Sequence, residues 1–569
     1  MNNLILSTLK NIIKVLPFTY RKKSVLVSFL LLTNSVLELF GLAAFIPLFT
    51  IILQDNAIQK YESLTWLYEL LNFNSEKIFI IAIASLIVLV MVSKNFISLG
   101  ISYYQSKFSL SLYHYFAIRM HQYYYQKGFT FFKNTNSNII KRDINDVPQY
   151  FAKDMLFSVL NLFNEITVLS LIIIGVLIYD PKAIVLLSIA VLPIFLFFYR
   201  WVKKRSIRVA EKSNELAPEI WKYIYQSVFG YVDVQITNAE NRIRKQLGEL
   251  INEQTKLNVK KQLYLLAPTK VIENGMVLTI LTITIYGMCF LSSKQDLATL
   301  LGVFALAAYR IMPSINRLMI ALVAVRSNQY LFPIMMQITN YKAPDKIEHQ
   351  EITFEKQIEL QNISFKFPDA ENKLINKFNL TIKKGSAVGI MGPSGSGKTT
   401  LMNIMLGFLR PTNGKILIDD KELNESTLVP WRDKIGYVQQ DVYIIDGTII
   451  ENVAFGYDNA NTDVDRVERC LVKASLLPFV NTLPDGINTI IGERGANLSG
   501  GQKQRIGIAR ALYSGASILF FDEATSALDC QTESEITENI RQLNNEKLTV
   551  IVIAHRENTL KYCDKIVKI

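Results

Sequence analysis

Residues 392–400 read GPSGSGKTT, and this run decides the fold of the segment around it. Small residues allow consecutive backbone N–H groups to turn toward phosphate oxygens at the start of a helix, and Lys398 adds a point charge. An apolar run precedes the glycines and apolar residues at helical spacing follow them, so the pattern predicts a strand, a phosphate-binding loop and a helix. A glycine-rich turn that binds nothing would not need this context. The loop that we expect to hold a nucleoside triphosphate consists of Gly392, Pro393, Ser394, Gly395, Ser396, Gly397, Lys398, Thr399 and Thr400.

A second motif, LSGGQ at 498–502, is followed at 518–523 by the apolar run ILFF and the acidic pair Asp522-Glu523. The loop alone is shared by many nucleotide-binding proteins, whereas its pairing with LSGGQ resembles one superfamily, the ATP-binding cassette (ABC) proteins. The resemblance implies an α/β P-loop nucleotide-binding domain over 351–569 that hydrolyses ATP with the help of Mg²⁺. It also implies that hydrolysis drives the movement of a cargo through a membrane region.

The resemblance assigns a role to each catalytic position, and each role has a chemical reason. Thr399 and Asp522 are expected to hold Mg²⁺ through a hydroxyl and a carboxylate. Glu523 is expected to act as the general base toward the attacking water. Gln440 matches the glutamine that contacts the metal and the water, although the adjacent Gln439 leaves this register open. Three further residues complete the set: Lys398 on the phosphates, His555 on the γ-phosphate, and Phe367, which would stack on adenine unless it is an ordinary strand aromatic.

The LSGGQ signature implies a dimer. In the ABC arrangement this motif closes over ATP held by a second nucleotide-binding domain, and the chain carries one set of these motifs. We therefore expect a half-transporter that works as a homodimer with two composite sites. The residues involved are Ser499, Gly500, Gly501 and Gln502 of the signature, and Asp529, which lies where the family's subunits contact one another.

The rest of the chain has the composition of a membrane region. Half of the 569 residues are apolar, and the mean hydropathy is positive at +0.22. Residues 1–330 contain six apolar segments long enough to cross about 30 Å of hydrocarbon as helices. They lie near 24–53, 78–103, 155–179, 183–202, 271–292 and 297–324. We expect a multidomain membrane protein with a six-helix transmembrane domain, a linker at 331–350 and no cleaved signal peptide.

Basic residues predict the orientation of these spans. Residues 104–153 carry seven Lys or Arg against two Asp or Glu, and 203–270 carry thirteen against seven, whereas 54–77 carry two against four. Because basic loops tend to stay in the cytoplasm, both termini and the nucleotide-binding domain are predicted to be cytoplasmic. The net charge of +12 is then a topology signal, and no nucleic-acid partner is expected.

The two basic connections are too long to be structureless, and both carry helical periodicity. We expect helices that continue well past the bilayer, as in type IV ABC exporters. Their tips, at 138–147 and 219–230, resemble the coupling helices that meet the nucleotide-binding domain of exporters. The alternative is that both tips are solvated loop.

Four basic residues lie in apolar surroundings within or beside the spans: Lys94, Lys270, Arg310 and Arg317. A charge at membrane depth is costly unless it faces protein or water, so each is a candidate for contact with cargo. Placement at a helix end would also explain Lys94 and Lys270, and Lys270 could pair with Glu273 one turn away. If all four face inward in a dimer, they line a cationic cavity suited to an anionic group such as a diphosphate.

The run ALAAYRIMPSINRLMIAL at 305–322, with the basic residues on the second and fifth spans, resembles the PglK-type flippases of lipid-linked oligosaccharides. This resemblance implies outward movement of a polyprenyl diphosphate-linked glycan across a bacterial inner membrane. It also implies a short external helix at 61–73, where Trp66 and Tyr68 suit a bilayer interface; a helix that caps the spans is the alternative. Export of lipid A, peptides or drugs is a second interpretation. A channel or regulatory ABC subunit is less favoured because the catalytic residue types are intact.

Overall fold

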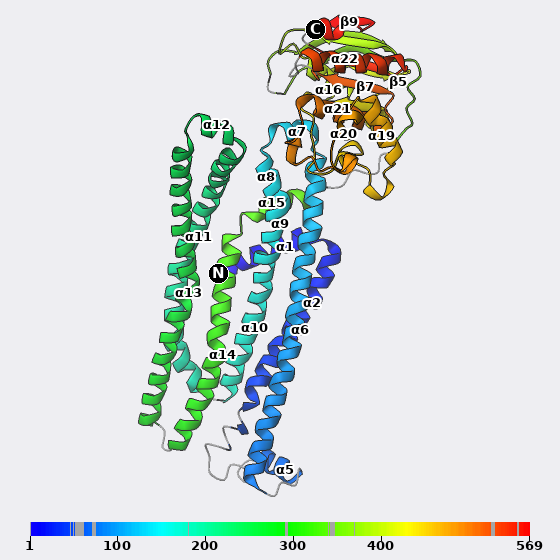
Figure 1. Cartoon of the computed structure of the whole chain (residues 1–569). Helices are drawn as coiled ribbons and strands as arrows, with labels where there is room; N and C mark the ends of the chain where they lie inside the picture. The colour runs from blue at the N-terminus through cyan, green and yellow to red at the C-terminus, as the bar shows by residue number, and fades with distance from the viewer. Residues whose placement is uncertain are drawn as a thin grey trace. The chain divides into compact units, whose positions relative to one another are not determined.

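The chain forms two compact units, the first containing Met1–Gln126 and Thr135–Lys342 and the second Lys127–Asn134 and Ala343–Ile569 (Figure 1). The boundary between residues 342 and 343 falls inside the predicted linker. The computed structural model describes residues 2–45, 47–48, 51, 62–70, 75–179, 181–290, 294–339, 341, 348–368, 370–524, 530–554 and 557–569.

Long helices build the first unit, and they carry the predicted spans. These helices are α2 (Phe18–Ala43), α6 (Glu76–Tyr125), α10 (Phe157–Tyr179), α11 (Pro181–Phe229), α13 (Glu240–Phe290) and α14 (Lys294–Ser327). The helices α6, α11 and α13 have 50, 49 and 51 residues. At about 1.5 Å per residue each is roughly 75 Å long, more than twice the hydrocarbon thickness of a bilayer. These lengths agree with the expectation that helices continue past the membrane, which stays a prediction.

Length and hydropathy identify fewer spans than the six predicted. Within the described part of the chain, three helical stretches qualify: Phe18–Gly41, Glu76–Tyr125 and Ser137–Gly175. The stretch Arg310–Ser327 passes the same test only together with α15 (Leu331–Thr339), and the two are bent by 66°. The helical membrane region is thus established, and the count of six stays a prediction.

The helices of the first unit pack as a bundle with one long hairpin. The helices α11 and α13 lie side by side and are joined through α12 (Tyr231–Ile236), while α10 packs against both α2 and α14 (Figure 1). Before α10, the chain runs through α8 (Ser137–Lys141), the π-helical turn η1 (Arg142–Asp146), α9 (Val147–Tyr150) and a second π-helical turn, η2 (Phe151–Leu156). This packing brings α2, α6, α10 and α14 together around buried polar residues.

Two helices of the first unit were not expected. The helix α1 (Asn2–Val15) precedes the first span, and its Thr8 accepts a hydrogen bond from Gln329 at 3.0 Å. The helix α15 occupies the first nine residues of the predicted linker. Its apolar residues recur at helical spacing and are buried, so the segment gains a packed face that a linker would lack: Leu331, Phe332, Met335 and Ile338.

The predicted external helix at 61–73 corresponds to α5 (Glu62–Leu70), and residues 61 and 71–73 lie outside the described chain. Tyr68 packs edge-on against Phe79 of α6, with ring centroids 5.1 Å apart. Trp66 is 62% exposed. One aromatic therefore holds α5 on the bundle while the other faces outward, so the packing and the interfacial interpretations each describe one side of this helix.

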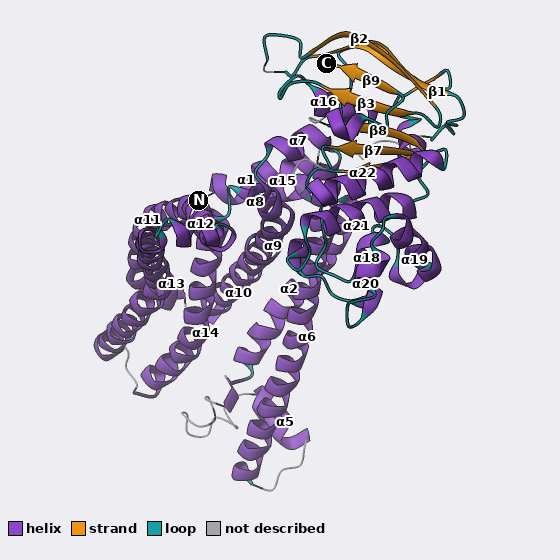
Figure 2. Ribbon diagram, turned by 45° about the horizontal axis from the view of Figure 1, so that its top comes forward, coloured by secondary structure: helices purple, strands orange, loops and turns teal. Residues whose placement is uncertain are grey.

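Two sheets organise the second unit (Figure 2). The parallel sheet has the order β6-β7-β8-β3-β9, and the antiparallel sheet has the order β2-β1-β4-β5. The strands are β1 (Gln357–Phe365), β2 (Ile375–Lys383), β3 (Ala387–Met391), β4 (Asn413–Ile418), β5 (Lys421–Glu422), β6 (Ile435–Val438), β7 (Ile518–Asp522), β8 (Thr549–Ile553) and β9 (Lys565–Lys568). Strands β7 and β8 are buried along their whole length, as parallel strands covered on both faces are.

Helices cover the parallel sheet of the second unit. They are α16 (Lys398–Met405), α17 (Leu428–Arg432), α18 (Ile449–Val453), α19 (Val464–Lys473), α20 (Leu477–Val480), α21 (Gly500–Tyr513) and α22 (Cys530–Asn545). The short turns are η3 (Asn459–Asn461), η4 (Gly486–Asn488), η5 (Glu493–Gly495) and η6 (Glu557–Leu560). The carboxyl ends of β3, β7 and β8 meet at one edge, which is where parallel sheets of this kind bind ligands.

A helix from the long connection after α6 also belongs to the second unit. This is α7 (Gly128–Asn134), whose Phe129 stacks on Phe408 with ring centroids 5.3 Å apart. The segments at 138–147 and 219–230, where the sequence predicts coupling elements, both belong to the first unit, and their role stays a prediction.

Candidate functional site

The phosphate-binding loop lies between β3 and α16, where the sequence placed it. Gly395 and Gly397 have φ values of 83° and 101°, in the left-handed region that glycine adopts without strain. A Cβ on Gly392 would lie 2.6 Å from the backbone oxygen of Ile569 and 2.7 Å from Ser396 Oγ. Glycine is thus required for the backbone conformation at two positions and for close packing at a third.

Polar groups in this loop fit a phosphate. Lys398 is buried, and its Nζ donates to the carbonyl oxygens of Gly392 and Pro393, each at 3.0 Å. Ser396 Oγ is buried and has no hydrogen-bond partner within the described part of the chain. A buried cation and an unpartnered hydroxyl at the start of α16 match what phosphate oxygens require. These residues could therefore hold the phosphates of ATP, which supplies the γ-phosphoryl group for transfer.

Two candidate magnesium ligands lie together at the end of β7. Thr399 Oγ1 donates to Asp522 Oδ1 at 3.3 Å, and the Tyr437 hydroxyl donates to Asp522 Oδ2 at 3.3 Å. Burial raises the pKa of Asp522, and the two hydroxyl groups oppose this shift. A cation would stabilise the buried carboxylate, and oxygen ligands of this kind suit Mg²⁺. When bound, the ion neutralises charge on the phosphates.

The predicted base and the predicted glutamine are each fixed by backbone contacts. Glu523 follows β7 with a φ of 51°, and its backbone N–H donates to the Ile553 carbonyl of β8 at 3.1 Å. Gln504 of α21 donates through Nε2 to the carbonyl oxygens of Gln439 and Gln440, at 3.2 and 2.7 Å. The helix that begins at the signature motif therefore also holds the segment that carries Gln440.

The signature motif caps α21. Ser499 Oγ accepts from the Gln502 backbone N–H at 3.2 Å, and Gln502 Oε1 accepts from the Ser499 N–H at 2.8 Å. This reciprocal capping box satisfies two helix-start donors. Ser499 and Gly500 are exposed while Gly501 is buried, so the tip of the motif faces solvent in this chain.

Three predicted residues have less support from the structure. Phe367 lies two residues beyond the end of β1, is 36% exposed, and contacts Phe365 edge-on with ring centroids 4.9 Å apart. Its stacking on adenine stays a prediction. His555 and Asp529 lie outside the described residues.

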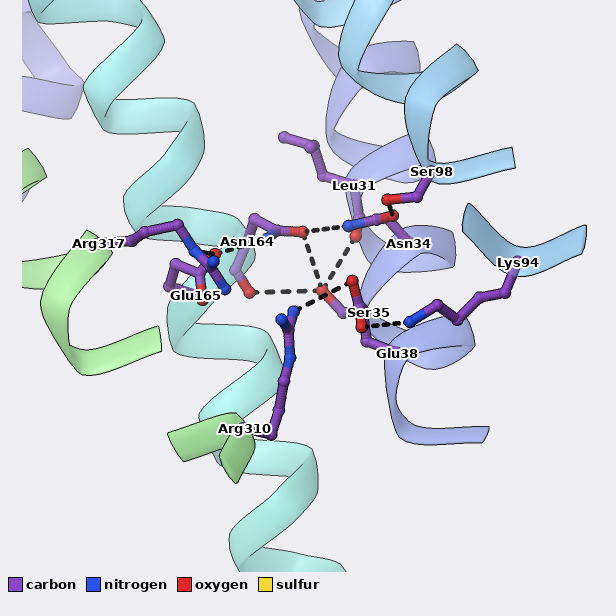
Figure 3. Close-up of polar contacts among 10 residues, drawn as sticks. All are labelled: Leu31, Asn34, Ser35, Glu38, Lys94, Ser98, Asn164, Glu165, Arg310 and Arg317. Atoms are coloured by element: carbon purple, nitrogen blue, oxygen red, sulfur yellow. Dashed lines mark hydrogen bonds and ion pairs between the residues drawn. The ribbon is translucent and has the colours of Figure 1, made fainter. Parts of the chain in front are cut away.

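In the membrane region, two of the predicted cationic residues share one carboxylate (Figure 3). Glu38 of α2 binds Lys94 of α6 through Oε2 at 2.8 Å and Arg310 of α14 through Oε1 at 3.2 Å. The three side chains are only 10 to 15% exposed. The expected cationic lining is thus partly neutralised within the chain.

The other two basic residues are also paired. Arg317 of α14 donates to both carboxylate oxygens of Glu165 on α10, at 2.6 and 3.3 Å, and Glu165 is almost fully buried. Lys270 pairs with Glu273 one turn away at 2.9 Å, and its side chain is 74% exposed. The cluster therefore gathers Lys94, Arg310 and Arg317, while Lys270 has the exposed pairing that the sequence allowed for.

Sequence reasoning missed four residues that hold these sites together: Glu38, Glu165, Tyr437 and Gln504. The signal for the first two was available, because each is a single acidic residue in an apolar run, and a buried carboxylate needs a buried cation. Tyr437 and Gln504 had no such signal, since a tyrosine on a strand and a glutamine on a helix are ordinary.

Comparisons with known proteins agree with this geometry. Residues 375–526 match the family model for the ABC transporter. The ATP-dependent lipid A-core flippase 2 of Colwellia psychrerythraea is 28% identical over 448 residues, which cover 77% of this chain and 74% of that protein. The ATP-dependent lipid A-core flippase of Bordetella avium is 43% identical over 210 residues, which cover 37% of this chain and 35% of that protein.

A solved structure, a bacterial Atm1-family ABC exporter with ATP bound, matches nearly the whole fold. The TM-score is 0.74 at 22% identity, and the match covers 97% of this chain and 93% of that chain. It supports one architecture for both units, a helical membrane region followed by an ATPase domain. This chain therefore carries an ABC transporter ATPase domain in an exporter half-transporter architecture, and its ATP hydrolysis is coupled to transport.

Proposed function

We propose that this protein is an ATP-driven flippase for a phosphate-bearing glycolipid, with a polyprenyl diphosphate-linked oligosaccharide as the first candidate cargo. It would act as a homodimer in a bacterial inner membrane, with both termini and the ATPase domain in the cytoplasm. The observation that carries this proposal is the cluster of Lys94, Arg310 and Arg317 inside the membrane region. Cations at membrane depth are costly unless they face protein or water, and they suit a cargo whose charged part is a phosphate.

Lipid A is the second candidate cargo. The relatives named lipid A-core flippases favour it, and the relative from Colwellia psychrerythraea aligns over most of this chain. Both candidates combine a phosphate group, a sugar and long apolar chains. They differ in the lipid, so the cation cluster by itself does not separate them.

Reconstitution separates the candidate functions. The purified protein in phosphatidylcholine liposomes would be given a polyprenyl diphosphate-linked glycan, lipid A or a neutral hydrophobic drug. Stimulated hydrolysis with ATP-dependent movement of the first or second cargo supports that cargo. Stimulation by the drug alone would contradict the proposal, and so would ion conductance without lipid movement.

A further inference from the structure

The carboxylate of Glu38 is shared by two buried cations, and this leaves positive charge unbalanced. Among the residues that the structure describes, Lys94, Arg310 and Arg317 pair with two carboxylates, Glu38 and Glu165, which gives a formal excess of one positive charge. Glu165 is engaged through both oxygens with Arg317. The excess therefore belongs to the triad of Glu38, Lys94 and Arg310.

Hydrogen-bonding capacity is also left over beside this triad. Arg310 Nε is buried without a hydrogen-bond partner among the residues that the structure describes, and so is Ser314 Oγ. Ser314 follows Arg310 by one turn of α14, so the two groups lie on the same side of that helix. Buried donors of this kind are costly unless an acceptor reaches them. An anion that satisfied them would also balance the excess charge.

We infer that Glu38 is an internal counter-anion that competes with the phosphate of the cargo for Lys94 and Arg310, and so sets the affinity for anionic cargo. The inference rests on the proposed function. A phosphate presents more acceptor oxygens than a carboxylate, and arginine binds it in a bidentate manner. Phosphate binding would release Glu38 from one or both cations, so part of the binding free energy goes into breaking those ion pairs.

The surrounding contacts allow Glu38 to leave without separating the helices. One turn before Glu38, Asn34 and Ser35 of α2 contact Asn164 Oδ1 of α10, each at 3.3 Å. Ser98 of α6 donates to Asn34 Oδ1 at 2.7 Å. These neutral hydrogen bonds join α2, α6 and α10 independently of the carboxylate (Figure 3). Glu38 itself joins α2 to α6 and α14. Without it, the bond between Ser98 and Asn34 still links α6 to α2. The pair of Arg317 and Glu165 still links α14 to α10, so a charge-balancing role accounts better for the position of Glu38.

The test is Glu38→Gln, which keeps the shape of the side chain and removes its charge. The protein in phosphatidylcholine nanodiscs would be titrated with a polyprenyl diphosphate and with the neutral polyprenol of the same chain length. We expect the variant to bind the diphosphate about tenfold more tightly and to bind the polyprenol as the wild type does. Lipid A and inorganic pyrophosphate are further probes, which tell a lipid-borne phosphate from a free one.

Two variants control for charge and for folding. Glu240→Gln removes a carboxylate from the exposed pair with Arg244, and we expect no change in either affinity. Glu38→Asp keeps the charge but shortens its reach to the two cations, so an intermediate gain for the diphosphate is expected. This second variant also tests the inference if Glu38→Gln proves too unstable to purify.

Several outcomes would overturn the inference. The first is that both Glu38 variants bind the diphosphate no more tightly than the wild type does. The second is that their affinity for the polyprenol rises as much as their affinity for the diphosphate. A lower melting temperature with no charge-selective gain would assign Glu38 a purely structural role. The proposed function fails separately, if neither glycolipid stimulates hydrolysis by the wild type. A charge-selective gain in Glu38→Gln would then still establish the counter-anion.

Discussion

At the scale of single residues, the conformation of Glu523 connects strain with catalysis. Its φ of 51° is uncommon for a residue with a side chain, and such strain is concentrated at functional sites. The bond from its backbone N–H to Ile553 holds the residue at the end of β7, directly after the candidate magnesium ligand Asp522. This placement suits a general base whose carboxylate must point away from the sheet.

Replacing Glu523 by Gln should abolish steady-state hydrolysis while ATP still binds. Loss of a positioned general base costs about 10²- to 10⁴-fold in rate. Hydrolysis would be measured by phosphate release and binding by a fluorescent ATP analogue. Glu538→Gln, which removes an exposed carboxylate from the same domain, is the control and should turn over normally. Hydrolysis within a few-fold of the wild type in Glu523→Gln would refute the assignment.

Gln504 provides a second test at this scale. Its side chain is buried, and the two hydrogen bonds that its Nε2 donates go to the backbone that carries Gln440. Gln504→Leu keeps a similar volume but leaves two carbonyl groups without their donor, at a cost of about 1–3 kcal/mol. We expect kcat to fall about tenfold with the KM for ATP little changed. Gln531→Leu, at an exposed glutamine, is the control; equal losses in both variants would contradict a positioning role.

At the scale of elements, the ease of prediction depended on how local the pattern was. The phosphate loop and the pair Thr399 and Asp522 follow from motifs whose spacing is fixed by a strand, a turn and a helix. Glu38 lies 56 positions from its partner Lys94 in the sequence. Glu165 lies 152 positions from its partner Arg317. No local spacing encodes such partners, so only the packed bundle reveals them.

Helices whose existence depends on packing were also missed. The helix α15 has nine residues, and an isolated helix of that length is marginal in water. Burial of residues such as Met335 stabilises it, and this burial cannot be read from a window of sequence. By contrast α6 and α13 were expected, because their apolar spans and the periodic segments beside them are long.

The helix α7 allows the link between transport and hydrolysis to be tested. It belongs to the ATPase unit, yet along the chain it connects α6 and α8 of the membrane unit. Its stacking partner is Phe408, and an aromatic pair contributes about 0.5–1.5 kcal/mol beyond its buried area. Phe129→Ala should therefore reduce cargo-stimulated hydrolysis several-fold while hydrolysis without cargo persists.

Proteoliposomes with and without a glycolipid cargo would give the two rates for Phe129→Ala. Phe132→Ala is the matched control, because its ring is 41% exposed and contacts the neighbouring Phe131. If both variants keep full stimulation, or if both lose hydrolysis altogether, α7 does not have the expected coupling role.

At the scale of the whole molecule, the exposed signature motif suggests that function needs two chains. Ser499 and Gly500 face solvent at the start of α21, whereas Lys398 is buried in the phosphate loop. Residues that contact the same nucleotide would then come from different subunits. An isologous dimer of this kind contains two identical composite sites, each with the loop of one chain and the signature of the other.

Complementation between two inactive chains tests this arrangement. Lys398→Ala removes the phosphate cation, and Ser499→Arg blocks the signature, so each homodimer should be inactive. A mixed dimer has one site with both defects and one site with neither. When the two chains pair at random, about a quarter of all sites are intact. If each site turns over independently, the mixture should hydrolyse ATP at about a quarter of the wild-type rate. Purification through two different affinity tags, one on each chain, isolates the mixed dimer, in which half of the sites are intact. Nucleotide hydrolysed by the mixed dimer in a single turnover supports composite sites, and a mixed dimer as inactive as its parents would mean that the loop and the signature act within one chain.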